Sequence, residues 1–385
     1  MLYKELGRNK ITGMDKKHLT IEEIAQMADV SVSTVSRVLN ANPQVAEELA
    51  ERVNKVIRET GYSPSPLATS FARGRMSSIA LISGMPEIGE SAGADALHSP
   101  SEIPISNPAI NSFVLALSVG IYDTIEPGGY HLRLVNVPRA SHTLSSEEFD
   151  RWFDATVDVR EISGVIFINP AEREPVIDIL ARRDYPCVVI GDTTGPASLP
   201  RVDVDNVEGV RSATNHLLTL GHRRIAFLCP KGDRTVIRDR AEGFTEAFEF
   251  LELPLPKTWW LESPQTEYPL FSYLNARRAI EEALNGEFPY TAVVAYNDEM
   301  AFGAIQAFAA RGWKVPERVS VMGFDDLPAA RMFAPPLSTV RQDIIKLGQY
   351  AARLLLRKLK GKKVPLVTVI PTELVVREST AVPHS

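Results

Sequence analysis

Cysteine is almost absent from this 385-residue chain, which also has no long apolar run and no strong excess of charge of either sign. The two cysteines, Cys187 and Cys229, each lie inside an apolar run typical of a buried strand, PCVVI and IAFLCP. Buried free thiols are therefore expected instead of a disulfide, and no spacing around either residue indicates a metal site.

Signals for membranes and export are also missing. No apolar segment approaches the roughly 18 to 20 residues that a membrane helix needs, and the N-terminus lacks the apolar core of a signal peptide. The sequence therefore predicts a cytoplasmic protein. The GxxxxGKS/T, HExxH and paired CxxC signatures are absent as well. We expect no enzyme activity, no catalytic residues, no metal and no cofactor.

The charge is unevenly distributed along the chain. The net charge is −6, and the 44% hydrophobic and 23% charged residues are ordinary for a soluble globular protein. Residues 1–75 contain 11 Lys and Arg and 9 Asp and Glu, a net charge of +2 that leaves −8 for the rest. A nucleic-acid contact is therefore allowed in the first segment and not expected over the acidic remainder.

Three short amphipathic helices are predicted between residues 19 and 63. Thr20-Ile-Glu-Glu23 is a capping box that starts the first helix, and Ser31 can cap a second helix that begins at Val32. A third helix, closed by Gly61, carries an apolar side formed by Leu49, Val53, Val56 and Ile57. Because only a few residues join the first two helices, the arrangement is that of a helix-turn-helix.

The second helix, VSVSTVSRVLN, has two contrasting faces. Its inner face carries Val35, Val38 and Leu39, and its outer face carries Val32, Ser33, Ser36 and Arg37. Small hydroxyl side chains with one Arg are unusual on a helix face that only contacts water. The outer face is therefore interpreted as a docking surface for DNA. A three-helix scaffold or partner-binding bundle is the alternative that the helix pattern leaves open.

The run LTIEEIAQMADVSVSTVSRVLN, followed by VAEELAERVNKVIRETGYSPS, resembles the DNA-binding headpiece of the lactose-repressor (LacI/GalR) family. The resemblance implies that Val32 and Ser33 read bases and that Arg37 is a further groove contact. Arg37 can pair with a guanine, which is worth about 1–3 kcal/mol of discrimination. The residues expected at DNA are Thr20, Val32, Ser33, Thr34, Ser36, Arg37, Asn40 and Phe71.

Residues 64–76 are expected to form a hinge helix and linker. Two prolines set off the stretch from Leu67 to Ala72, which is shorter than the ~12–15 residues at which an isolated helix becomes marginal in water. The resemblance implies a hinge helix that folds on the operator, with Phe71 in place of the family's usual Leu as the wedge in the minor groove. A Pro-rich linker with one stray Phe is the alternative from composition alone.

From residue 77 onward, short β-rich runs alternate with helical stretches. The predicted strands are SIALIS, HLRLVN, GVIFIN, PCVVIGD, RIAFLC, TAVVAY and VSVMGF, and the clearest helices are Val207 to Leu220 and Met300 to Ala310. This alternation predicts parallel sheets covered by helices on both faces, which bind ligands beyond the carboxyl ends of their strands. The polar residues at those ends are Asp192, Asn297, Asp298, Asp325 and Asp326. Asp298 and Asp326 are interpreted as helix caps or structural pairs, and Asp205-Asn206 as the cap of the following helix.

These segments also resemble the family's effector domain, which has the two-lobed fold of periplasmic sugar-binding proteins. The resemblance rests on runs such as VDNVEGVRSATNHLLTLGHRRIAFL, RDRAEGF and VVAYNDEMAFGAI. It implies that Arg240, Asn297 and Asp325 line the cleft and hold effector hydroxyls, with Asp192 a weaker candidate. These three residue types supply the donors and acceptors that a polyol requires. For an aromatic that stacks on the ligand, Tyr268 and Phe271 are candidates.

The predicted fold is an N-terminal all-α helix-turn-helix headpiece followed by a two-lobed α/β effector domain resembling periplasmic binding proteins. Its segments are a disordered N-terminal extension (1–18), the headpiece (19–63), the hinge helix and linker (64–76) and the effector-binding and dimerisation domain (77–385). Residues 85–105 form an insert relative to the family, interpreted as a surface loop or as a lid over the cleft.

The sequence therefore predicts a sequence-specific transcriptional regulator, expected to be a repressor, controlled by a small-molecule effector. No leucine heptad for a coiled-coil tetramer is seen, so we expect a homodimer that reads pseudo-palindromic operator DNA. The effector is expected to be a carbohydrate, and a nucleobase, a nucleoside or a protein corepressor is the alternative. A sugar receptor that does not bind DNA and an enzyme acting on sugars are the competing classes.

Overall fold

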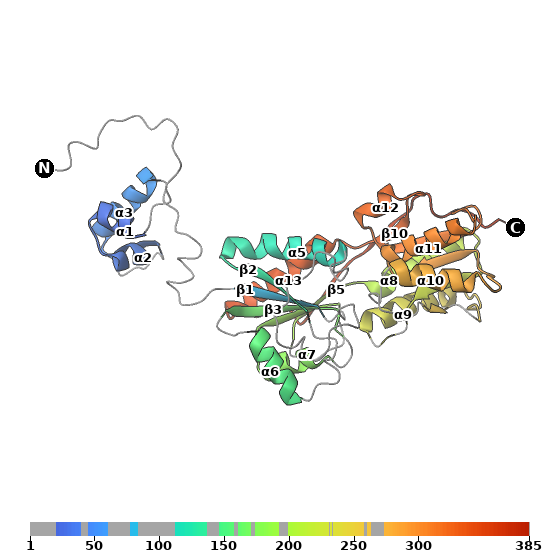
Figure 1. The fold of residues 1–385 in the computed structure, drawn as a ribbon, viewed down its shortest axis with the longest axis horizontal. Helices are drawn as coiled ribbons and strands as arrows, with labels where there is room; N and C mark the ends of the chain where they lie inside the picture. The colour runs from blue at the N-terminus through green and yellow to red at the C-terminus, as the bar shows by residue number, and fades with distance from the viewer. Residues whose placement is uncertain are drawn as a thin grey trace. The chain divides into compact units, whose positions relative to one another are not determined.

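The chain divides into two compact units, Met1–Met76 and Ser77–Ser385. The structure is a computed structural model (Figure 1) that describes residues 21–39, 45–60, 78–83, 112–136, 146–157, 161–170, 174–191, 199–230, 232, 234–257, 260–262 and 273–384. Within these ranges, no helix combines the length and the apolar character needed to cross a membrane.

The first unit contains three helices, α1 Ile21–Ala28, α2 Val32–Leu39 and α3 Glu47–Thr60. Their apolar sides meet in one small core formed by Ile24, Ala25, Ala28, Val35 and Val53. Helices this short are marginal alone, so their stability comes from this shared core. The three helices predicted from the sequence are confirmed.

The turn between α1 and α2 is held by α3. Asp29 ends α1 with a left-handed φ of 50°, and Ser31 caps α2 as predicted, its Oγ accepting from the Thr34 N–H at 3.1 Å. From α3, Arg52 donates to the Ala28 carbonyl oxygen at 2.8 Å and to the Asp29 carboxylate at 3.0 Å. These bonds fix the direction in which α2 presents its outer face.

The second unit has two lobes, each built on a six-stranded sheet. In the first lobe the strand order is β11-β5-β4-β3-β1-β2, and its paired strands are parallel. The strands are β1 Ser78–Ser83, β2 His131–Asn136, β3 Ile162–Ile168, β4 Cys187–Ile190, β5 Arg201–Val204 and β11 Val367–Ile370. The helices are α5 Ser112–Ile125, a 3-10 turn Glu126–Gly128, α6 Ser146–Thr156, α7 Pro175–Arg182 and α13 Ile344–Leu359.

Helices cover both faces of this first sheet. Helices α5 and α13 pack together on one face, and α6 and α7 lie on the other (Figure 1). Along β1, Ile79 and Leu81 join the core cluster on the first face, and Ala80 and Ile82 join the cluster on the second. Burial on both faces explains why the strand sequence is an unbroken apolar run.

The second lobe has the strand order β12-β10-β9-β8-β6-β7, in which only β12 is antiparallel to its neighbour. Its strands are β6 Ile225–Cys229, β7 Trp260–Glu262, β8 Ala292–Ala295, β9 Ser320–Asp325, β10 Ser338–Arg341 and β12 Glu373–Val375. Its helices are α8 Asn206–Thr219, α9 Thr235–Phe250, α10 Tyr273–Ala283, α11 Asp298–Ala310 and α12 Pro328–Met332.

The chain passes between the lobes three times. The crossings run from β5 to α8, from β10 to α13 and from β11 to β12. The lobes are thus joined by short segments around Asp205, around Gln342 and around Thr372. A change in the angle between the lobes has to be absorbed at these three places.

The two-sheet α/β fold and the seven predicted strands are confirmed. Five short strands, β5, β7, β10, β11 and β12, are not among the seven predicted strands. Each has only three or four residues, and RVDV and STVR carry charged or hydroxyl side chains that interrupt the apolar pattern. Their place in the sheets comes from pairing with strands distant in sequence.

Close approach of α5 and α13 requires glycine at two positions. A Cβ at Gly120 would collide with the carbonyl oxygen of Ile345, and one at Gly348 would collide with that of Leu117. The backbones of the two helices therefore pack directly against each other.

We predict that Gly348→Ala lowers the free energy of unfolding by roughly 1–3 kcal/mol, because backbone atoms must move apart to admit the methyl group. Denaturant unfolding measures the change. Gly286→Ala is the control, since its Cβ would meet no atom closer than 3.9 Å. Equal midpoints for Gly348→Ala and the unmodified protein would contradict the close helix contact.

Candidate functional site

The outer face of α2 is the candidate DNA-reading surface. Val32, Ser33 and Arg37 are exposed, and Thr34 and Ser36 are half-buried. The predicted residues Thr20, Asn40 and Phe71 lie outside the described residues, as do the hinge 64–76 and the insert 85–105.

A network of short hydrogen bonds orders the start of this surface. The Ser31 hydroxyl shares hydrogen bonds of 2.8 Å with the hydroxyl of Ser33 and with that of Thr34. Because the same Ser31 oxygen caps the helix, the side chains at its first turn are held in place before any partner arrives. A preorganised first turn suits the readout of base edges.

The second unit contains a cavity at the carboxyl ends of both sheets. It holds about 490 Å³ of space not filled by atoms, a figure that includes open solvent at its mouth. The described residues that line it are Phe113, Asn169, Ile190, Gly191, Asp203, Val236, Arg240, Tyr296, Asn297, Asp325, Gln342 and Leu347. The structure therefore brings Arg240, Asn297 and Asp325 together; Asp192 lies outside the described residues.

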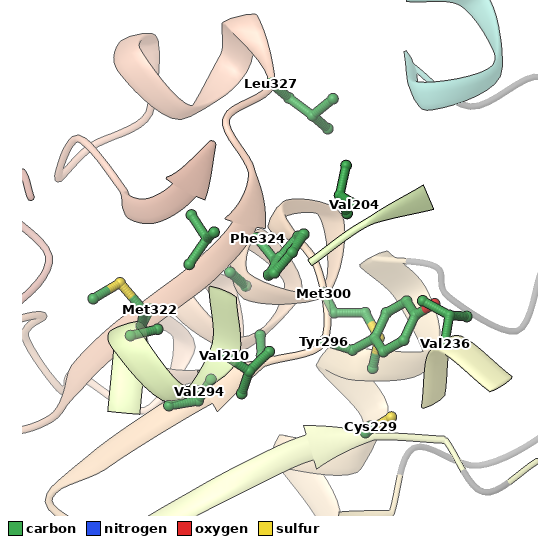
Figure 2. Packing of buried hydrophobic residues seen from close by; sticks show 14 of the residues in the cluster. Val204, Val210, Cys229, Val236, Val294, Tyr296, Met300, Met322, Phe324 and Leu327 are labelled. Carbon is green, nitrogen blue, oxygen red and sulfur yellow. The ribbon is translucent and has the colours of Figure 1, made fainter. Parts of the chain in front are cut away.

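Apolar residues at the strand ends pack beneath the polar residues that line the cavity. Figure 2 shows Tyr296 and Phe324 at the ends of the neighbouring strands β8 and β9, with Val204 at the end of β5 in the same cluster. On the first lobe, Gly191 has a φ of 84°, and a Cβ there would collide with the side-chain oxygen of Asn169. Only glycine fits beside Asn169 at this edge.

Arg240 is the most extensively held side chain of the cavity. It is 4% exposed, and its Nε donates to Asn206 Oδ1 at 2.9 Å while another nitrogen donates to the Tyr296 carbonyl oxygen. Its guanidinium carbon lies 3.7 Å from the centre of the Phe324 ring. Packed between an aromatic face and hydrogen-bond acceptors, the guanidinium has one fixed orientation.

Asp325 faces this guanidinium. Asp325 Oδ1 lies 4.0 Å from Arg240 Nη2 and accepts a hydrogen bond from the Gln342 side chain. Its φ of 121° is in the region that residues with a Cβ rarely adopt. The strand end is thus bent so that the carboxylate enters the cavity.

Asp298 and Asp326 were predicted to be helix caps or structural pairs, and the structure shows structural pairs for both. Asn297 caps α11, with Oδ1 accepting from the Met300 N–H at 2.9 Å. Asp298 is fully buried and accepts hydrogen bonds from Thr339 Oγ1 at 2.6 Å and from the Leu327 N–H at 2.8 Å.

Asp326 points away from the cavity lining and forms ion pairs. Its carboxylate contacts Arg341 at 2.8 Å, Arg377 at 2.5 Å and Arg331 at 3.5 Å. Burial alone would raise the pKa of Asp326, but the hydrogen bonds from Arg341 and Arg377 outweigh it and the pKa is lowered. Asp325 and Asp326, adjacent in sequence, thus have opposite roles.

Three polar residues at or beside the cavity are not predicted from the sequence as site residues: Asp203 in β5, and Asn206 and Gln342 at crossings between the lobes. Asp203 accepts from the Val204 N–H at 2.7 Å and from Asn206 Nδ2 at 3.1 Å. Asn206 also binds Arg240, and Gln342 binds Asp325. The one signal was the acid inside RVDV, because a charge in a buried strand needs a reason. Asp205 caps α8 as predicted, accepting from the Glu208 N–H.

Burial raises the pKa of several carboxyl groups in and behind the cavity. The pKa of Asp203 is raised to about 7 because the carboxylate is removed from water, although Val204, Arg240 and Asn206 act in the opposite direction. Burial also raises the pKa of Asp325, of Asp298 and of Glu299, the last to about 7. The cavity is therefore an unfavourable place for negative charge unless a ligand compensates it.

Comparisons with known proteins identify the family. The model for bacterial regulatory proteins of the lacI family matches residues 20–65, and that for a periplasmic binding protein-like domain matches residues 214–380. The HTH-type transcriptional regulator DegA of Bacillus subtilis is 30% identical over 94% of this chain and 98% of its own length. This chain belongs to the LacI family. It is therefore a DNA-binding transcriptional regulator.

Other LacI-family relatives are similar over almost their whole length. The HTH-type transcriptional repressor PurR of Haemophilus influenzae is 29% identical, with 94% of this chain and 98% of PurR covered. The lac repressor dimer bound to operator and the anti-inducer ONPF has a TM-score of 0.69 at 25% identity, covering 95% of this chain and all of that chain. A complex of the regulator CelR with cellobiose has a TM-score of 0.65 at 27% identity, covering 94% and 99%.

One short sequence pattern is typical of a different class of protein, the serine hydrolases. The sequence GESAG at Gly89–Gly93 has the GxSxG spacing of serine hydrolases, a pattern that carries meaning only on a strand-turn-helix elbow. It lies outside the described residues, and the relatives named above are transcriptional regulators or repressors.

We predict that Asp203→Asn stabilises the unliganded protein, and more so at high pH. The unfolded chain ionises Asp203 near its ordinary pKa of 3.8, whereas the folded chain resists ionisation up to about pH 7. The free-energy cost of keeping Asp203 buried in the folded protein thus grows between about pH 4 and pH 7. Replacing the carboxyl group by an amide removes this cost and raises the free energy of unfolding by roughly 1–3 kcal/mol at pH 8.

Thermal and denaturant unfolding at pH 5 and pH 8 measure this gain. Asp205→Asn is the matched control, because Asp205 is partly exposed and Asn also caps helices well. A gain at Asp203→Asn that is equal at both pH values, or absent, would contradict the buried, costly carboxylate.

Proposed function

We propose that this LacI-family regulator is a repressor that binds a pseudo-palindromic operator as a homodimer and is released by a small carbohydrate. The observation that carries the proposal is the convergence of Arg240, Asn297 and Asp325 in one cavity between two sheets. Guanidinium, amide and carboxylate groups together offer donors and acceptors to the hydroxyls of a polyol.

The cellobiose complex of CelR supports a carbohydrate, because that relative has the same fold over nearly the whole chain. A planar nucleobase is the second candidate, and the aromatic residues Phe113 and Tyr296 at the cavity favour it. The Tyr296 ring, however, already has the Arg240 guanidinium 4.5 Å from its centre. That contact occupies ring surface that a base would need, so the carbohydrate is preferred.

Effector binding is coupled to DNA through the lobe crossings. Asn206 and Gln342 stand at two of the crossings and bind Arg240 and Asp325 respectively. A ligand that binds Arg240 and Asp325 therefore acts directly on the segments that set the angle between the lobes. A coupling of about 1–3 kcal/mol suffices for a 5- to 150-fold change in operator affinity.

The first experiment measures binding of the purified protein to genomic fragments that flank its own gene, at physiological salt. A panel of sugars and nucleosides is added in turn. One fragment bound selectively and released by one sugar is the expected result. Release by a nucleoside alone would reject the carbohydrate, and equal binding to all fragments and to competitor DNA would reject operator recognition by the protein alone.

We predict that Arg37→Ala weakens binding to the operator about 5- to 150-fold while non-specific binding falls much less, because a base contact is lost. Fluorescence anisotropy on operator and scrambled duplexes measures both. Arg58→Ala is the control for the loss of one positive charge, since Arg58 is exposed on α3. Equal losses on both duplexes would make Arg37 a phosphate contact.

We predict that Arg240→Ala abolishes release by the effector and leaves operator binding within about threefold, because the headpiece folds as its own unit. The same anisotropy assay, with and without the releasing sugar, checks this. Arg238→Ala, exposed two residues earlier on α9, should respond normally. A normal response of folded Arg240→Ala would show that the effector binds elsewhere.

A further inference from the structure

Asp203 is a buried acid that lines the cavity and is bound directly by neutral groups. Its side chain is 4% exposed and lines the cavity from the end of β5. Its hydrogen-bond partners are the Val204 N–H and the Asn206 amide. Within the described part of the chain, no cationic side chain forms an ion pair with it.

The charges along the described cavity lining do not balance. Two carboxylates, Asp203 and Asp325, face a single guanidinium, Arg240. Arg240 lies within ion-pair distance of Asp325, and Asn206 stands between Arg240 and Asp203, bonded to both. Asp239 adds a further negative influence on Asp203. When both acids are ionised, one negative charge of the described lining is thus left without a cation to pair with.

The two hydrogen bonds within the protein leave acceptor capacity on Asp203. Oδ1 accepts from the Val204 N–H and Oδ2 accepts from Asn206 Nδ2, and each carboxylate oxygen can accept a second bond. A cationic donor that enters the cavity can therefore bind Asp203 without displacing either bond.

We propose that Asp203 is a specificity-determining ligand contact and that the effector carries a protonated amine beside its hydroxyls, as an amino sugar does. The inference rests on the proposed function, because it refines the chemistry of the same cavity. The amine is placed against Asp203, and the hydroxyls face Arg240 and Asn297. In a cavity shielded from water, such a charge-assisted bond is stronger than a bond between neutral groups.

Hydroxyls are required in addition to the amine because the lining also presents donors. The Arg240 guanidinium can only donate hydrogen bonds, so a ligand without acceptors could not form a hydrogen bond with it. An alkyl polyamine satisfies the acids but offers no acceptors. An amino sugar satisfies both sets, which is why it is preferred to spermidine.

The test compares matched ligands by isothermal titration calorimetry on the full-length protein at pH 7. The pairs are glucosamine with glucose, galactosamine with galactose and mannosamine with mannose, and spermidine is included as an amine without hydroxyls. The expected result is that one amino sugar binds at least tenfold more tightly than its hydroxyl partner. In Asp203→Asn this preference should fall to less than threefold, which isolates the pairing between the amine and the carboxylate.

Asp205→Asn is the charge-matched control and should keep the preference, since Asp205 does not line the cavity. Melting curves of all variants confirm that they are folded. A parent sugar that binds as tightly as its amino partner overturns the inference and leaves the carbohydrate function standing. A preference for the amine that persists in Asp203→Asn overturns the role of Asp203. Binding of spermidine alone overturns the carbohydrate function and the inference together. Binding of no ligand in the set overturns the inference and leaves the carbohydrate function to the operator-release experiment.

Discussion

The burial of one guanidinium is the interaction on which the effector domain depends. Arg240 projects from α9 in the second lobe, lies on the Phe324 ring and binds Asn206 at the first crossing. Its charge faces Asp325, which in turn is held by Gln342 at the second crossing. Because these bonds join both crossings through one charged pair, the position of the ligand site and the angle between the lobes are set by the same atoms.

The buried charged groups of the effector domain lower its stability, so their presence calls for an explanation. Burying ionised groups is repaid only when geometry and hydrogen bonds are good, and packed apolar residues of similar size often do as well or better. Asp298 illustrates the structural use, with Thr339 and the Leu327 N–H meeting its oxygens. Asp203 likewise accepts one backbone and one side-chain hydrogen bond, but it also lines the cavity, where a ligand can reach it.

Local sequence patterns predicted the parts of the molecule that local interactions determine. The capped helix α2, the apolar strands and the strand-end residues Asn297 and Asp325 follow from spacing and from the polarity of strand ends. The resemblance to the LacI family added Arg240, whose place on a helix gives no hint of a ligand. The roles of Asn206 and Gln342 at the cavity were beyond reach, because both residues lie at crossings whose neighbours are decided by pairing of distant strands. For Asp203, in β5, the one signal was an acid inside a short buried strand. The capping residue of α11 is Asn297 and not Asp298. This difference of one residue in the helix start is smaller than a sequence pattern can resolve.

Ligand chemistry and conformational change cannot be separated in such a site. A ligand that only filled the cavity would bind either lobe angle equally well and would shift no equilibrium. A ligand that satisfies the carboxylate of β5 in the first lobe and the guanidinium of α9 in the second binds best when both are at the right distance. The preference for one lobe angle then equals the difference in these polar contacts between the two angles. In the proposed mechanism, polar groups on both sides of the cavity therefore give the regulator its selectivity and its response through the same contacts.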